Sequence, residues 1–254
     1  MIAFSCSGET LLGTLDEAPG TIGLLIVSGG NEIRAGAHRG MATLASRLAA
    51  QGVPVFRYDR RGVGDSSGEN TGYSGARDDL LAATAAFRAA APQVARIVGF
   101  GNCDAATTLA LWGHDAGVES LILANPWVVA PGADLPPPAA IRAHYGQRLR
   151  DPETWWRLLR GGISLRKATR GLRAIAAPPS ADTLTQQATG AITRWGDDAT
   201  VILARGDNTA IAYAEAVRGR AEPHTIMIDT ASHSFARPGD AAALEAAILQ
   251  ALRR

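Results

Sequence analysis

Short runs of apolar and β-branched residues alternate with alanine-rich stretches of helical periodicity along most of this chain. This alternation is typical of β-α-β units, so we expect an α/β fold with a mostly parallel eight-stranded sheet and helices on both faces. The first two strands are expected to form an antiparallel edge. The predicted strands are Ala3–Cys6, Thr10–Asp16, Ile22–Val27, Val53–Tyr58, Val94–Phe100, Glu119–Ala124, Thr200–Ala204 and His224–Asp229. The predicted helices of the core are His38–Gln51, Ala76–Ala91, Asp104–Gly113, Thr209–Arg218 and Asp240–Leu252.

The alternation stops at the proline-rich segment 126–138. Residues 139–193 that follow have helical character, many basic side chains and no strand signal. We therefore predict a helical cap at 126–195, inserted between two parts of one core at 1–125 and 196–254. The cap is the only subdomain that the pattern indicates.

Composition sets the broad class of protein. The 254 residues suffice for one large domain, and 46% apolar with 19% charged residues is ordinary for a globular enzyme. The N-terminus has no secretory-signal pattern, and no apolar run is long enough to span a bilayer. These observations favour a cytoplasmic protein without an integral membrane segment. We expect no nucleic-acid partner.

Charge is distributed unevenly, although the formal net charge is only +1. Segment 142–173 holds nine basic residues against two acidic ones, which gives it a charge of +7. Two interpretations stay open. The segment is either a solvated helical face or a basic surface near the site mouth that attracts an anionic substrate, a carrier or a membrane face. Peripheral membrane association therefore remains an alternative.

A candidate nucleophile lies where a predicted strand turns directly into a predicted helix. Only three residues join Val94–Phe100 to Asp104–Gly113, and the segment Gly101-x-Cys103-x-Ala105 within this turn resembles the nucleophile elbow, usually G-x-S-x-G. A helix N-terminus stabilises a thiolate, so a cysteine here is expected to be reactive. The alternative is that Cys103 is only a small buried apolar residue.

The other cysteine, Cys6, lies in an edge strand without this context and is interpreted as structural. Neither cysteine has the spacing of a metal site or of a disulfide framework. We expect no metal and no cofactor.

Two later loops supply candidates for a base and an orienting acid. Asp207 follows the strand 200–204 in a loop that resembles the one carrying the acid of α/β-hydrolases, and His233 follows the last strand in a loop that resembles the one carrying their histidine. All three side chains would then meet at the C-terminal edge of one sheet. Asp229 is a rival for the acid, because it lies nearer to His233 in the sequence.

A hydrolase of this kind also needs backbone N–H groups to bind the negatively charged oxygen, or oxyanion, that forms when the nucleophile attacks a carbonyl. Asp104, the residue after the nucleophile, supplies one N–H, and the Gly29-Gly30 loop after strand 22–27 supplies the N–H of Gly30, with Asn31 beside it. The glycines could instead form only a flexible turn. The segment 59–68 (DRRGVGDSSG) also resembles a segment of the family and supports the fold rather than the mechanism.

Taken together, these residues resemble the first of two types of α/β-hydrolase associated with the exosortase A system. The resemblance rests on Gly29-Gly30 with Arg34, Gly36, His38 and Arg39, on Gly101-x-Cys103-Asp104-Ala105-Ala106, on Asn125-Pro126-Trp127, on His144-Tyr145 and on Trp155-Trp156. It implies the α/β-hydrolase fold in a bacterial protein encoded near exopolysaccharide and protein-sorting genes, with no assigned substrate.

Aromatic residues of the predicted cap are candidates for substrate binding. Trp127, Trp155 and Trp156 would line an acyl pocket under the cap, and we place His144 with them. Ordinary packing of the cap onto the sheet is the alternative explanation.

The sequence thus predicts a hydrolase that cleaves a carboxylic ester or thioester through an acyl-enzyme on Cys103. Its partner would be a small-molecule or carrier-bound acyl substrate. Three alternatives remain: an acyltransferase acting on a polysaccharide or a carrier-bound acyl group, a catalytically silent protein that kept the fold for binding, and a lipid-surface protein that uses the basic cap.

Overall fold

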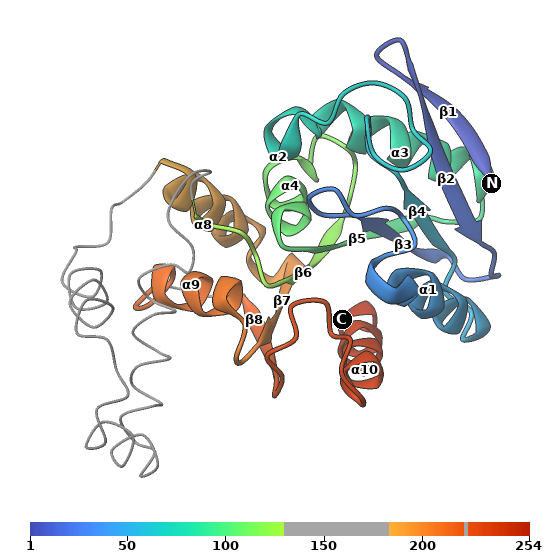
Figure 1. The fold of residues 1–254 in the computed structure, drawn as a ribbon. Helices are drawn as coiled ribbons and strands as arrows, with labels where there is room; N and C mark the ends of the chain where they lie inside the picture. The colour runs from blue at the N-terminus through green and yellow to red at the C-terminus, as the bar shows by residue number, and fades with distance from the viewer. Residues whose placement is uncertain (130–182, 221–222) are drawn as a thin grey trace, which may run out of the picture.

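The computed structural model describes residues 1–129, 183–220 and 223–254 (Figure 1). Within these residues, eight strands form one sheet in the order β1-β2-β4-β3-β5-β6-β7-β8. The two contacts of β2, with β1 and with β4, are antiparallel, and every other neighbouring pair is parallel. The strands are β1 (Ile2–Cys6), β2 (Glu9–Asp16), β3 (Ile22–Val27), β4 (Val55–Tyr58), β5 (Arg96–Asn102), β6 (Ser120–Ala124), β7 (Ala199–Ala204) and β8 (His224–Ile228). The predicted fold class, including its antiparallel edge, is confirmed.

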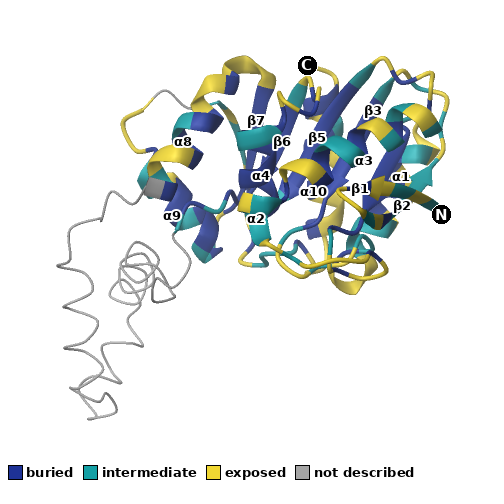
Figure 2. Cartoon of the chain, turned by 90° about the horizontal axis from the view of Figure 1, so that it is seen from above, coloured by how far each residue is buried: buried dark blue, intermediate teal, exposed yellow. Residues whose placement is uncertain are grey.

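Helices cover both faces of this sheet. On one face, buried residues of α1 and α10 pack on the strands, and on the other face those of α3, α4, α8 and α9 do so. The buried strands lie between these two layers (Figure 2). The helices are η1 (Ala37–Arg39), α1 (Gly40–Ala50), α2 (Gly72–Gly75), α3 (Arg77–Ala90), α4 (Asp104–Trp112), α8 (Thr183–Trp195), η2 (Gly196–Asp198), α9 (Asn208–Ala216) and α10 (Asp240–Leu252).

Most boundaries lie within two residues of the prediction, and β3 and α10 have the predicted bounds. The clearest difference is at the predicted helix 38–51, where α1 begins only at Gly40. His38 and Arg39 have φ values of 51° and 60°, and this left-handed backbone interrupts the helix. A second difference is that β5 extends to Asn102, because Asn102 pairs with Ala124 of β6. The strand therefore reaches the residue just before Cys103.

The helix α8 lies inside the range predicted as the cap. It buries Leu184, Ile192 and Trp195 in the same apolar cluster as α4. The Trp195 indole N–H donates a hydrogen bond of 3.0 Å to the carbonyl oxygen of Ala110, and its ring stacks on His114. These contacts make α8 a layer of the sheet-bearing core. The cap boundary itself remains a prediction, since 130–182, with His144, Trp155, Trp156 and the basic segment, lie outside the described residues.

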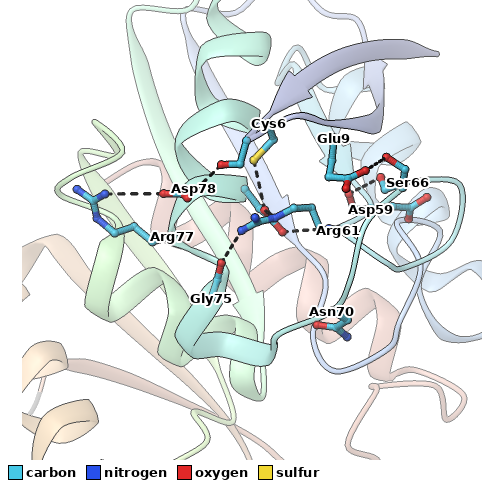
Figure 3. A network of polar contacts seen from close by, with 12 residues as sticks. Cys6, Glu9, Asp59, Arg61, Ser66, Asn70, Gly75, Arg77 and Asp78 are labelled. Carbon is cyan, nitrogen blue, oxygen red and sulfur yellow. Dashed lines mark hydrogen bonds and ion pairs between the residues drawn. The ribbon is translucent and has the colours of Figure 1, made fainter.

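A polar network holds the segment after β4, and Cys6 belongs to it (Figure 3). The buried carboxylate of Asp79 accepts the backbone N–H of Arg61 at 3.0 Å and pairs with the Arg61 guanidinium, which also donates to the carbonyl of Gly75. The Cys6 thiol donates to Asp79 at 3.4 Å. Burial, followed by the charge of Asp79, raises the pKa of Cys6. A buried thiol beside a carboxylate is poorly ionised, which fits the structural role that we expected.

Candidate active site

Cys103 is the single residue between the end of β5 and the beginning of α4, and its backbone conformation is strained. Its φ of 63° and ψ of −126° are rare for a residue with a side chain. Backbone hydrogen bonds hold it there: its N–H donates to Ala124 at 3.0 Å, and its carbonyl accepts from Ala106 and Trp127, each at 3.1 Å. Such strain persists only where the surroundings over-determine it. The backbone thus has the geometry of a nucleophile elbow.

The small residues around Cys103 have a steric cause. A Cβ atom added at Gly101 would lie 2.7 Å from the carbonyl carbon of Ala105 and 2.9 Å from the nitrogen of Ala106. Both are backbone atoms of α4, so they cannot move aside as a side chain could. The side chain of Ala105 is fully buried where β5 and α4 approach each other. The spacing Gly101-x-Cys103-x-Ala105 therefore reflects the close approach of strand and helix.

We expect Gly101→Ala to destabilise the protein by about 1–3 kcal/mol, because the added methyl group overlaps helix backbone. The urea midpoint of unfolding measures the change. Gly190→Ala is the matched control: in the middle of α8, its new Cβ would have only the Arg194 side chain within 4 Å, at 3.8 Å. That variant should keep or raise stability, since alanine favours a helix. Equal midpoints for both variants would contradict the steric argument.

Loops after β7 and β8 bring Asp207 and His233 together. The Nδ1 atom of His233 lies 3.0 Å from Oδ1 of Asp207. The other carboxylate oxygen of Asp207 accepts the N–H groups of Thr209 and Ala210, each at 3.0 Å, and so caps α9. One carboxylate therefore both starts the helix and orients the imidazole. The rival, Asp229, has a 95% exposed side chain, which lies 3.7 Å from Arg205 and makes no described contact with His233.

The Cys103 side chain also acts on the His233 ring, since it is among the groups that raise the pKa of the imidazole. The bond to Asp207, then the interaction with Cys103, raises the pKa of His233 to about 10 against the cost of burial. Burial would raise the pKa of Asp207, but the hydrogen bond and charge of His233, with the two backbone N–H groups, lower it overall. An imidazole with a pKa this high is protonated at neutral pH.

These two shifts predict how stability depends on pH. The folded pKa of His233 lies above its ordinary value of 6.5, so its contribution is complete below pH 6.5 and is lost as the pH rises toward 10. The pKa of Asp207 lies below 3.8, so its contribution is complete above pH 3.8 and is lost at lower pH. The free energies of unfolding of the native protein and of His233→Gln, measured in urea, should differ most between pH 3.8 and pH 6.5 and converge by pH 10. A difference that is constant from pH 6 to 10 would contradict the assignment.

One of the two predicted oxyanion donors is already occupied by a hydrogen bond. The N–H of Gly30 donates to Oδ1 of Asp104 at 2.6 Å. The carbonyl of Gly30 accepts from the guanidinium of Arg60 and, at 3.1 Å, from the Asn70 amide, which also donates to Oδ1 of Asn31 at 2.8 Å. The loop after β3 is thus held from both sides. The Gly30 N–H reaches a substrate oxygen only if the Asp104 carboxylate leaves it.

Three residues of this site escaped the sequence analysis: Arg60, Asn102 and Asn125. Arg60 is 2% exposed, and both terminal nitrogens of its guanidinium lie 3.4 Å from Oδ2 of Asp104. The segment 59–68, whose resemblance to a family segment supports the fold, also supplies this arginine. Asn102 and Asn125 both contact the backbone of His233. The only signal for them was their position beside Cys103 and in the Asn125-Pro126-Trp127 turn.

The described residues give part of the surroundings of the site. A cavity of about 200 Å³ lies between η1, α1 and α10, and Ser234 and Phe235 of the His233 loop line it. Neither Cys103 nor His233 lines this cavity. Trp127 is partly buried and packs against the apolar cluster that includes α4, and its predicted role in substrate binding stays a prediction. Among the described residues, no group of three or more His, Cys, Asp or Glu side chains is arranged to hold a metal ion.

The sheet order, the strained residue between β5 and α4 and the loops after β7 and β8 define an α/β-hydrolase fold. A model of the alpha/beta hydrolase family matches residues 24–247, and the chain belongs to this family. A search of the curated proteins found no match. In the described part of the chain, no helix combines the length and apolar character needed to cross a bilayer.

Similar solved structures include an alpha/beta hydrolase from Sphaerobacter thermophilus, with 19% identity and a TM-score of 0.57 over 97% of this chain and 100% of that one. The esterase Pf2001 of Pyrococcus furiosus has 14% identity and a TM-score of 0.63 over 100% and 88%. The enol-lactonase of Burkholderia xenovorans has 14% identity and a TM-score of 0.58 over 99% and 100%. At identities this low, the structural similarity establishes the shared fold and nothing beyond it.

Proposed function

We propose that the protein hydrolyses a carboxylic ester or thioester through an acyl-enzyme on Cys103, with His233 as acid and base and Asp207 as its orienting partner. The observation that carries the proposal is that an imidazole hydrogen-bonded to a buried carboxylate also has its pKa raised by the cysteine at the strained strand-to-helix turn. Membership in the alpha/beta hydrolase family supports hydrolysis as the reaction class.

The raised pKa of His233 suits a cysteine better than a serine. At neutral pH the ring carries its proton, and the proposed reacting state is a thiolate–imidazolium pair. The sulfur attacks the carbonyl carbon of the substrate, and the carbonyl electron pair moves onto oxygen. When the intermediate collapses, His233 gives its proton to the leaving alcohol or thiol. A serine hydroxyl would instead need a neutral imidazole to remove its proton.

Deacylation uses the now neutral His233. The ring takes a proton from water as the water oxygen attacks the thioester carbon, and the second intermediate releases the acid and restores the thiolate–imidazolium pair. Asp207 keeps the proton of Nδ1 directed toward itself, so that Nε2 faces the reacting atoms. In both steps the backbone N–H groups of Gly30 and Asp104 would hold the oxyanion.

Oxyanion binding requires the Asp104 carboxylate to release the N–H of Gly30. Arg60 is the group that would retain it, because its two terminal nitrogens already lie 3.4 Å from Oδ2 of Asp104. A buried guanidinium stabilises the carboxylate after it has moved. We therefore propose that substrate binding shifts Asp104 from Gly30 toward Arg60.

A panel of p-nitrophenyl esters and acyl-thioesters tests the reaction, with intact-mass detection of the covalent intermediate. The expected result is turnover together with a mass increase of one acyl group, located on Cys103 by peptide mapping. Discharge of that acyl group onto a sugar hydroxyl in place of water would make the protein an acyltransferase. An absent adduct across the panel, with Cys103 no more reactive than a model thiol, would contradict the proposal and favour a binding protein.

The form of the substrate and the biological role are proposed only from the resemblance to the exosortase-associated α/β-hydrolases. A carrier-bound acyl substrate and a role beside exosortase and exopolysaccharide genes are what the motifs in the sequence imply. Assays with an acyl group on a carrier and as a small ester would separate the two substrate forms.

A further inference from the structure

Two asparagine side chains meet at the backbone carbonyl of His233. The Asn102 amide donates to this oxygen at 3.1 Å, and the Asn125 amide donates to it at 3.3 Å. The two also bind each other, since Asn125 donates to Oδ1 of Asn102 at 3.1 Å. The remaining acceptor, Oδ1 of Asn125, receives the N–H of Ala204 at 2.9 Å. One closed network thus joins the ends of β5, β6 and β7 to the loop of His233.

The burial, backbone conformation and hydrogen bonds of Asn125 all suit its place in this network. The residue is fully buried, and both hydrogens and the oxygen of its amide are used. Its φ of 41° lies in the left-handed region, which asparagine tolerates better than most residues. A carboxylate of the same shape could accept from Ala204 but could not donate to two carbonyl oxygens. Asparagine therefore satisfies the backbone and every polar partner.

We propose that Asn102 and Asn125 are positioning residues that set the distance between the His233 ring and the Cys103 sulfur. Asn102 is the covalent neighbour of Cys103, so its hydrogen bond ties the backbone of the base to the residue beside the nucleophile. Asn125 fixes the same carbonyl from the adjacent strand end and anchors it to β7, the strand that precedes Asp207. This inference rests on the proposed function, because it assigns the network a purpose only if sulfur and imidazole act together.

The alkylation rate of Cys103 reports the pairing without a known substrate. An imidazolium beside the sulfur stabilises the thiolate, so iodoacetamide should react with the native protein at pH 6 faster than with a model thiol. Peptide mass spectrometry separates Cys103 from the buried Cys6. His233→Ala should lose the fast reaction at pH 6. If His233→Ala keeps the native pH profile, the proposed catalytic pair itself is wrong.

The variants Asn125→Asp, Asn102→Asp and Asn102→Ala test the network. Asn125→Asp keeps the shape and the acceptor for Ala204 but loses both donated hydrogen bonds. We expect each variant to slow alkylation of Cys103 at pH 6 by about 10- to 100-fold and to move the pH profile toward that of His233→Ala. Effects of changes at the two positions should be less than additive, because the residues share one carbonyl.

A core variant separates positioning from stability. Leu48→Ala removes a fully buried side chain from α1 and lowers stability without touching the network. At a temperature where every variant is folded, it should keep the native alkylation profile. The inference is overturned if folded Asn102 and Asn125 variants also keep that profile while His233→Ala loses it. Should the Asn125 variant fail to fold, the two Asn102 variants decide alone.

Discussion

Replacing Cys103 by alanine should lower kcat/KM for an ester or thioester by at least about 10⁴-fold, because the acyl-enzyme cannot form without the sulfur. The fold should remain, since alanine fits a half-exposed position. Steady-state hydrolysis and intact-mass detection of the adduct measure the loss. Cys6→Ser is the matched control: it exchanges the other cysteine and keeps a donor for Asp79. That variant should retain native activity.

Cys103→Ser sharpens the same prediction. A hydroxyl must lose its proton to neutral imidazole, yet the bond to Asp207 favours the protonated ring of His233. The serine variant should therefore be far less active than the native protein at pH 7 and gain activity as the pH rises. Full activity of Cys103→Ala would contradict an acyl-enzyme at this residue and favour a protein that kept the fold for binding alone.

Asp207→Asn should reduce kcat/KM by about 10³- to 10⁴-fold, because an amide can favour the wrong tautomer of the histidine. Asparagine is an equally good helix cap, so the bonds to the N–H groups of Thr209 and Ala210 are retained. The variant thus separates the catalytic use of the carboxylate from its use in capping α9. Hydrolysis rates over pH 5–10, compared with urea unfolding, measure both.

Asp229→Asn is the control for this second prediction. Asp229 was the rival acid in the sequence, and its exposed side chain lies next to Arg205. We expect this variant to keep native rates. Loss of activity in Asp229→Asn with none in Asp207→Asn would reverse the assignment.

Much of the fold follows from local pattern. The continuous apolar run of β3 and the alanine-rich periodicity of α10 predicted both elements with their observed bounds, because each pattern is set by near neighbours in the chain. The spacing Gly101-x-Cys103-x-Ala105 indicated the sharp turn for the same reason. What this pattern could not give is where α1 begins, since the left-handed backbone at His38 and Arg39 depends on the loop that precedes it.

In the candidate site, too, some features follow from local sequence and others from contacts between distant parts of the chain. The residue types and their order after the strands follow from the amino-acid sequence: a thiol at the elbow, an acid after β7 and a histidine after β8. Three contacts follow from the folded chain and not from local pattern. His233 meets Asp207 and not Asp229, Asp104 occupies the N–H of Gly30, and Asn102 reaches a carbonyl 131 residues away. The physical reason is that these contacts join strand ends that are remote in the chain, and only the packed sheet brings those ends to one edge.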